Sequence, residues 1–165
     1  MKGTPDQESE ILTAILALKD DPVGFAHYAY PWGAKGTSFE TLRAPRRWQA
    51  DDLCRIGEHV QEQVFRLENG MSPKVWKQAR SSGRGPGKSA EMGIVAHWHT
   101  STRIGAPTIV TANTESQLRT KTFPEFAVWF GAAVNSHWFT IDSLRIAPAP
   151  WLIEIVKKLE NQFGG

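Results

Sequence analysis

The chain has 165 residues, of which 41% are hydrophobic and 22% are charged, a composition that excludes a disordered tail and predicts a folded domain. Its 19 Lys and Arg residues against 17 Asp and Glu residues give a formal net charge of +2, which neither requires nor excludes a nucleic-acid partner. The single cysteine, Cys54, excludes an internal disulfide and a zinc site built from several thiolates, and it fits a reducing compartment.

The first half of the sequence predicts two helices separated by an irregular connector. Apolar residues recur at helical spacing between Ile11 and Leu18, so a short amphipathic helix is expected to end before Pro22. Residues 22–45 are rich in Gly, Pro and aromatic residues and predict an ordered loop. The second helix is expected over residues 48–67, where apolar residues are spaced by three or four and a Glu-Asn-Gly sequence supplies the stop.

The second half of the sequence alternates short extended runs with helical ones. Strands are expected over residues 74–81, 106–112 and 137–146, and the β-branched run in the second of them is typical of a buried strand. Helices are expected over residues 89–102, 115–134 and 151–163. Because this alternation implies parallel pairing with right-handed crossovers, we expect an α/β fold of the P-loop type. Its partial parallel sheet would carry helices on both faces, with residues 1–70 as an N-terminal helical segment and residues 71–165 as the core.

The segment Ser82–Ser89, between a predicted strand and a predicted helix, has the composition of a phosphate-binding loop. Glycines let successive backbone N–H groups converge on phosphate oxygens, and the following helix adds a partial positive charge. Lys88 would reach the β- and γ-phosphates, and the Ser89 hydroxyl would ligate Mg²⁺. The residues expected around the phosphates are Ser82, Gly83, Gly85, Pro86, Gly87, Lys88 and Ser89. The general pattern has glycine where Ser82 stands, so a solvated Gly-rich turn remains the alternative.

Three separated segments carry a family resemblance: Asp21–Gly33, Pro45–Gln49, and Arg80–Ser89 with the Thr111–Gln117 stretch that follows it. In this order and spacing they resemble the N-terminal ATPase region of the large subunit of tailed-bacteriophage terminases, the motors that pump double-stranded DNA into capsids. Terminase phosphate loops often lack the first glycine and often contain an arginine, as this loop does with Arg84. The resemblance covers most of the chain up to about residue 150.

The resemblance implies that the chain binds ATP with Mg²⁺ and assigns further residues to the site. Gln49 would recognise the adenine edge; the alternative is a helix-start glutamine that faces water. Arg84 would act with Lys88 on the γ-phosphate, because a guanidinium matches phosphate oxygens; the alternative is an exposed loop charge. Residues 113–117 either line the site past the end of a strand or cap a helix.

The sequence departs from the family where phosphoryl transfer needs a strand that ends in Asp-Glu. Asp142 is the nearest candidate, but Ser143 follows it, and nothing corresponds to the family's C-terminal nuclease domain. We therefore expect a truncated form that binds ATP without efficient hydrolysis. The alternatives are a remnant that binds no nucleotide and another P-loop ATPase or kinase. Cys54, with no identifiable base, is expected to be a small buried residue.

The partners expected from the resemblance belong to the complete protein. They are double-stranded DNA, the small terminase subunit, the portal and further copies of the chain in a ring, all in the host bacterial cytoplasm. Lys74, Lys77 and Arg80 add positive charge beside the loop, which suits nucleotide phosphates first and DNA second. No apolar run reaches the roughly 18 residues that cross a bilayer, so no membrane partner is expected.

Overall fold

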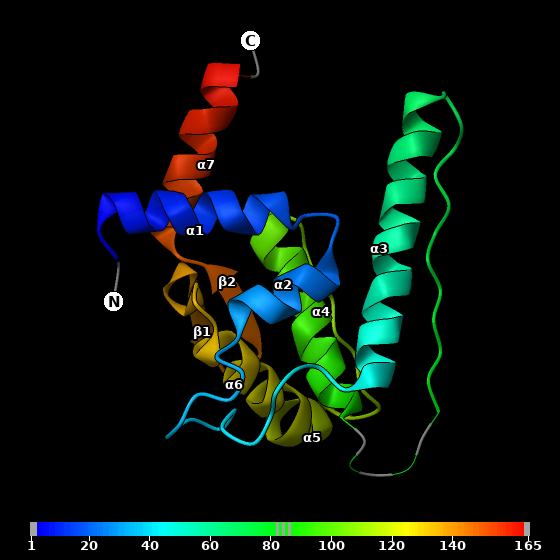
Figure 1. The fold of residues 1–165 in the computed structure, drawn as a ribbon, viewed down its shortest axis with the longest axis vertical. Coiled ribbons are helices and arrows are strands. Elements are labelled where there is room, and N and C mark those ends of the chain that lie inside the picture. The colour runs from blue at the N-terminus through cyan, green and yellow to red at the C-terminus, as the bar shows by residue number, and fades with distance from the viewer. Residues whose placement is uncertain (1–2, 82, 84, 86, 164–165) are drawn as a thin grey trace.

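The computed structural model describes residues 3–81, 83, 85 and 87–163, with the backbone alone for Pro5 and residues 158–163. These residues form a mostly helical fold with one short antiparallel hairpin (Figure 1). The helices are α1 Pro5–Ala17, α2 Pro22–Ala29, α3 Arg47–Glu68, α4 Lys88–Thr102, α5 Glu115–Gln117, α6 Phe123–Ala132 and α7 Pro150–Phe163. A π-helical turn spans Leu118–Thr122, a 3-10 turn spans Ser136–Trp138, and the strands are β1 Phe139–Asp142 and β2 Arg145–Pro148.

The prediction of an α/β fold with a parallel sheet is wrong, because the strands in the described part of the chain are an antiparallel pair. The segment expected as one strand over residues 137–146 instead turns at Ser143 and Leu144, which places Phe139 opposite Pro148. A local hairpin closes a much shorter loop than a crossover to a distant strand, so its entropic cost is smaller. The two other expected strands, residues 74–81 and 106–112, lie outside any sheet.

Local capping residues explain where α1 and α2 begin. The Thr4 hydroxyl accepts a hydrogen bond from the Gln7 N–H, and the Gln7 side chain accepts one from the Thr4 N–H, which forms a capping box. The Asp21 carboxylate accepts a hydrogen bond of 2.8 Å from the Gly24 N–H, and Pro22 is the first residue of α2. The expected loop from residue 22 therefore starts with a helix, although Asp followed by Pro is a recognisable helix start.

The core lies where α2 and α6 pack against α4. Gly93 of α4 allows the closest approach, because a Cβ atom at this position would lie 3.0 Å from Cδ1 of Trp129 on α6. Tyr30 and Phe39, from the connector after α2, stack at 5.8 Å, and both meet the Trp129 ring edge-on. Aromatic rings contribute large buried areas and specific geometry. The prediction of an ordered, aromatic-rich connector over residues 22–45 is therefore confirmed for residues 30–45 and wrong for residues 22–29, which form α2.

One histidine lies inside this core in its neutral form. His97 of α4 is fully buried, and its Nδ1 lies 2.9 Å from the hydroxyl of Tyr30. Burial lowers the pKa of His97 to about 3, against a smaller opposing contribution from Asn135. Burial likewise raises the pKa of Tyr30. The pair stays uncharged at neutral pH, so a polar contact is accommodated without a buried charge.

Helix α1 packs against the 3-10 turn that precedes the hairpin. Glu8 of α1 lies 2.6 Å from Nε2 of His137 and accepts a hydrogen bond from the indole N–H of Trp138. Burial raises the pKa of Glu8, but the hydrogen bonds from Trp138 and the Gly3 N–H and the charge of His137 outweigh it and lower the pKa overall. From this point α7 extends beyond α1 (Figure 1). Among the helices that the structure describes, none combines the length and apolar character that would let it span a bilayer.

Candidate nucleotide-binding loop and the adjoining groove

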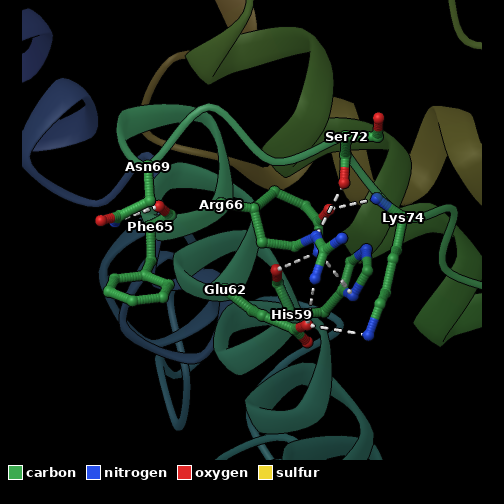
Figure 2. Close-up of polar contacts among 8 residues, drawn as sticks. His59, Glu62, Phe65, Arg66, Asn69, Ser72 and Lys74 are labelled. Carbon is green, nitrogen blue, oxygen red and sulfur yellow. Dashed lines mark hydrogen bonds and ion pairs between the residues drawn. The ribbon is translucent and has the colours of Figure 1, made fainter.

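Residues 71–81, named here the connecting segment, run as an extended chain beside α3 and lead into the loop (Figure 1). Figure 2 shows how α3 holds the start of this segment: the Arg66 Nε–H donates to the Ser72 carbonyl at 2.8 Å, and Lys74 Nζ lies 3.4 Å from the Glu62 carboxylate. Exposed ion pairs contribute little by themselves. The bond to the Ser72 carbonyl therefore matters more, because it attaches the backbone to the helix.

The end of the connecting segment is held by a buried carboxylate. Arg80 pairs with Asp52 of α3, whose side chain is 1% exposed, and its guanidinium lies 4.7 Å from the centre of the Trp48 ring. Trp76 contacts the His59 ring at 5.2 Å. Removing the partner of a buried carboxylate is costly, so the Arg80 pair is the strongest polar contact of this segment.

The Gly-rich loop ends at the first residue of α4. Gly87 is the residue before the helix, with φ of 93°, and Gly85 has φ of 83°, backbone conformations that residues with a Cβ rarely adopt. The Lys88 Nζ donates a hydrogen bond of 2.9 Å to the Gly83 carbonyl, five residues earlier, and so spans the loop. Helix α4 begins one residue before the expected start and ends at Thr102, as expected. The predicted site residues Ser82, Arg84 and Pro86 lie outside the described residues.

Gln49 contacts the loop although 38 residues separate it from Gly87. Its Nε2 donates a hydrogen bond of 2.8 Å to the Gly87 carbonyl, and its Oε1 accepts a hydrogen bond from the Arg46 N–H. The side chain is buried. The alternative of a glutamine facing water is therefore wrong. Both ends of the amide are bonded to backbone, so Gln49 supports the loop in this structure, and adenine recognition would have to use the second N–H and the second lone pair of this buried amide or replace these bonds.

Two other sequence-predicted candidates have clear local roles. The Thr114 hydroxyl accepts a hydrogen bond of 3.2 Å from the Gln117 N–H, which confirms the alternative that residues 113–117 cap a helix. Asp142 is exposed, and its Oδ1 accepts a hydrogen bond from the Ser143 N–H in the hairpin turn. Within the described part of the chain, no group of three or more His, Cys, Asp or Glu residues is placed to hold a metal ion.

Cys54 and Ser89 are both exposed. The prediction of a buried Cys54 is wrong, because its position on α3 is exposed to solvent. Ser89 is the second residue of α4, so its hydroxyl is accessible at the helix start. This position is compatible with the expected magnesium contact, which stays a prediction.

A groove of about 780 Å³ lies beside the loop. It is lined by Ile56 of α3, Met92 and Val95 of α4, and Trp76, Gln78 and Arg80 of the connecting segment. Residues 107–110 form a further wall, tied to α4 by the 2.9 Å contact between His99 Nδ1 and the Thr108 hydroxyl. Ile109 in this wall is 85% exposed, so the prediction of a buried strand over residues 106–112 is wrong.

Sequence reasoning missed Arg46 and Glu91. Arg46, the residue before α3, donates from Nη1 to the Gly85 carbonyl at 3.4 Å and so supports the loop together with Gln49. Glu91 lies in the groove one turn after Lys88 and is 8% exposed; burial raises its pKa, and the charge of Arg80 opposes this effect. Gln49 accepts from the Arg46 N–H at the start of α3, but no sequence pattern indicates the contact between Arg46 and Gly85.

Comparisons with protein-family models, with curated proteins and with solved structures found no match for this chain. The resemblance to terminases therefore depends on the sequence segments alone. The fold and the site define a mostly helical domain with a Gly-rich loop at the start of a central helix and an open groove beside that loop.

Proposed function

We propose that the loop from Gly83 to Ser89 binds the phosphates of ATP together with Mg²⁺. The observation that carries this proposal is the position of Lys88, whose Nζ lies over the loop on the Gly83 carbonyl while its backbone begins α4. A phosphate oxygen in place of the neutral carbonyl would form a charge-assisted bond with the same amine, which is the stronger interaction. The start of α4 carries the partial positive charge of a helix N-terminus, which would favour the same anion.

The orientation of one peptide unit supports this proposal. The Gly87 carbonyl points to α3, where it accepts from Gln49. Because the peptide bond is planar and trans, the N–H of Lys88 in the same unit points away from α3. Gln49 and Arg46 thus bond to two loop carbonyls near the start of α3, and the N–H side of this peptide unit faces away from the bond to Gln49.

We further propose that the chain is the ATP-binding part of a viral DNA-packaging motor of the terminase type. Two of the segments that carry the resemblance, Pro45–Gln49 and Arg80–Ser89, are in contact through Gln49 and Gly87. The complete protein would couple ATP hydrolysis to movement of double-stranded DNA in a ring of subunits, with the small terminase subunit and the portal, in the host bacterial cytoplasm. The chain alone would bind ATP and hydrolyse it slowly.

The test is a thermal-unfolding titration of the purified chain with ATP and Mg²⁺. A ligand at 100 times its Kd stabilises the folded state by about 2.7 kcal/mol, which would raise the Tm of a domain of this size by several degrees. Lys88→Ala should abolish the rise, whereas Lys77→Ala, which removes the same charge from an exposed site on the connecting segment, should keep it. An unchanged Tm of the parent protein would refute nucleotide binding.

Ser89 provides a separate test of the magnesium contact. Ser89→Ala should keep the Tm rise with ATP in EDTA and lose the additional rise that Mg²⁺ gives to the parent protein, because only the hydroxyl ligand is removed. An equal Mg²⁺ effect in both proteins would exclude Ser89 as a ligand.

A further inference from the structure

The connecting segment has the geometry of a β-strand without a sheet. Every described residue from 71 to 81 is exposed, and Trp76, Gln78 and Arg80 line the groove while the residues between them do not. This spacing of two is the period at which side chains alternate across a strand. In the described part of the chain, no backbone-to-backbone hydrogen bond joins residues 73–81 to another segment.

The contacts with α3 reveal which edge of this strand is open. The Ser72 carbonyl and the Lys74 N–H both bond to α3, through Arg66 and Gln63. In an extended chain the N–H and C=O of one residue point to one edge, and those of the next residue point to the other. Ser72 and Lys74 therefore present their backbone to α3, and if the same alternation continues along the segment, the N–H groups of residues 75, 77 and 79 lie on the open edge.

An apolar surface lies next to this open edge. Val75 is 80% exposed and Met92, in the groove, is 47% exposed. Ile109, in the β-branched run that the sequence pattern assigns to a buried strand, is 85% exposed on the further wall. An unpaired edge beside exposed apolar side chains is the arrangement that proteins use to bind a strand from another chain.

The charge along the segment distinguishes between possible occupants. Lys77 is exposed at its centre, between Lys74 and Arg80. Two copies of the segment paired antiparallel about Lys77 would place lysine opposite lysine, and like charges directly opposite each other destabilise a sheet. Edge lysines of this kind oppose self-association, whereas they attract a strand that carries carboxylates.

We propose that residues 73–81 accept an extended acidic strand from a partner protein. The strand bonds to the backbone of residues 75, 77 and 79, its apolar side chains cover the groove beside Trp76, and its carboxylates on the opposite face lie against Lys77. These backbone groups lie outside the loop, whereas the groove that the strand covers is also lined by Lys88, so strand binding is tested without nucleotide.

The test uses two synthetic eight-residue peptides, one of alternating Val and Glu and one of alternating Val and Lys, and the full chain without nucleotide. Fluorescence anisotropy should detect binding of the Val/Glu peptide and at least tenfold weaker binding of the Val/Lys peptide. Lys77→Glu should reverse this preference, because the residue is exposed and its substitution leaves the fold intact. Equal affinity for both peptides, or absence of binding to either, would overturn the proposal.

Amide hydrogen exchange distinguishes strand pairing from non-specific electrostatic binding of the peptide. The bound Val/Glu peptide should slow exchange at residues 75, 77 and 79 and leave residues 76 and 78 unchanged. Protection of all five amides alike, or concentration-dependent dimerisation of the free chain that protects the same edge, would refute strand addition by an acidic partner. Tighter binding of a DNA duplex than of the Val/Glu peptide at this edge would also refute it.

Discussion

The core around α4 and the groove on the other side of the same helix contain similar side chains in opposite surroundings. In the core, Tyr30, Phe39 and Trp129 enclose one another and are less than 10% exposed. In the groove, Ile109 is 85% exposed and Met92 is 47% exposed. Apolar residues stabilise a fold only where another surface covers them, so the core holds the domain together and the groove is available for a partner.

The two regions also differ in the polar contacts that organise them. The core uses the neutral pair of His97 and Tyr30, whereas the connecting segment uses the charged pair of Arg80 and Asp52. A neutral buried pair is sensitive to protonation, and a buried carboxylate is sensitive to the loss of its counter-charge. Substitutions and pH should therefore affect the two regions differently.

The largest expected effect comes from emptying the core. Phe130 is 1% exposed and contacts the rings of His97 and Phe139. Phe130→Ala should lower the unfolding free energy of the protein by about 3–5 kcal/mol, because a large cavity replaces the ring. Urea unfolding measures this change. Ile109→Ala, in the groove wall, should change it by about 0.5 kcal/mol or less. Similar losses of unfolding free energy in Phe130→Ala and Ile109→Ala would contradict the proposed difference between the core and the groove.

A smaller loss is expected where the connecting segment meets α3. Arg80→Ala should destabilise the protein by about 2 kcal/mol, less than the loss of a fully buried pair, because the Arg80 side chain is 34% exposed and Arg55 lies 3.7 Å from the same carboxylate. Lys77→Ala on the same segment is the matched control and should have almost no effect in urea unfolding. Equal stability of both variants would show that Asp52 does not depend on Arg80.

Acid should weaken the core through His97. Its pKa is lowered from 6.5 to about 3, so below pH 6.5 the unfolded chain binds a proton that the folded protein excludes. The contribution of neutral His97 to the unfolding free energy is fully present above pH 6.5. It falls by about 1.4 kcal/mol per pH unit as the pH drops towards 3. Urea unfolding between pH 7 and 5 measures the slope. His97→Phe should lose most of this pH dependence, and His27→Gln, at an exposed position, should keep it. An unfolding free energy of the parent protein that does not change between pH 7 and 5 would contradict the burial of a neutral histidine.

The smallest of these effects concerns the loop. Gly87→Ala should cost about 1–2 kcal/mol, because φ is 93° and the new Cβ would lie 3.0 Å from Nε2 of Gln49. Gly83→Ala, where a Cβ meets no atom within 4 Å, should be nearly neutral. Comparison of the two variants by urea unfolding, followed by the ATP titration, separates loop strain from nucleotide binding. A neutral Gly87→Ala would mean that the loop does not need its left-handed residue.

The helices were predictable where their signal is local. The apolar spacing that predicts a helix over residues 48–67 and the loop-to-helix transition at Lys88 both correspond to helices, α3 and α4, within two residues. The sequence does not predict α2, because the high content of Gly, Pro and aromatic residues in residues 22–45 is typical of a loop. The start signal at Asp21 and Pro22 is the local indication of this helix. Helix formation depends on contacts within four residues, so short windows of sequence carry the information.

The candidate site was predictable in part. The glycines that take left-handed conformations and the position of Lys88 follow from the motif, and the proximity of Gln49 follows from the resemblance. The support from Arg46 and the burial of Glu91 were not predicted, because they depend on how α3 and α4 pack against the loop.

The amino-acid sequence by itself determined the long helices, the glycine-rich loop before α4 and the extended tendency of residues 74–81 and 106–112. Only the tertiary structure decided that these two segments remain outside a sheet and that residues 139–148 pair with themselves. The physical reason is that a helix satisfies its own backbone, whereas a strand needs a neighbour that may come from a distant segment or from another chain.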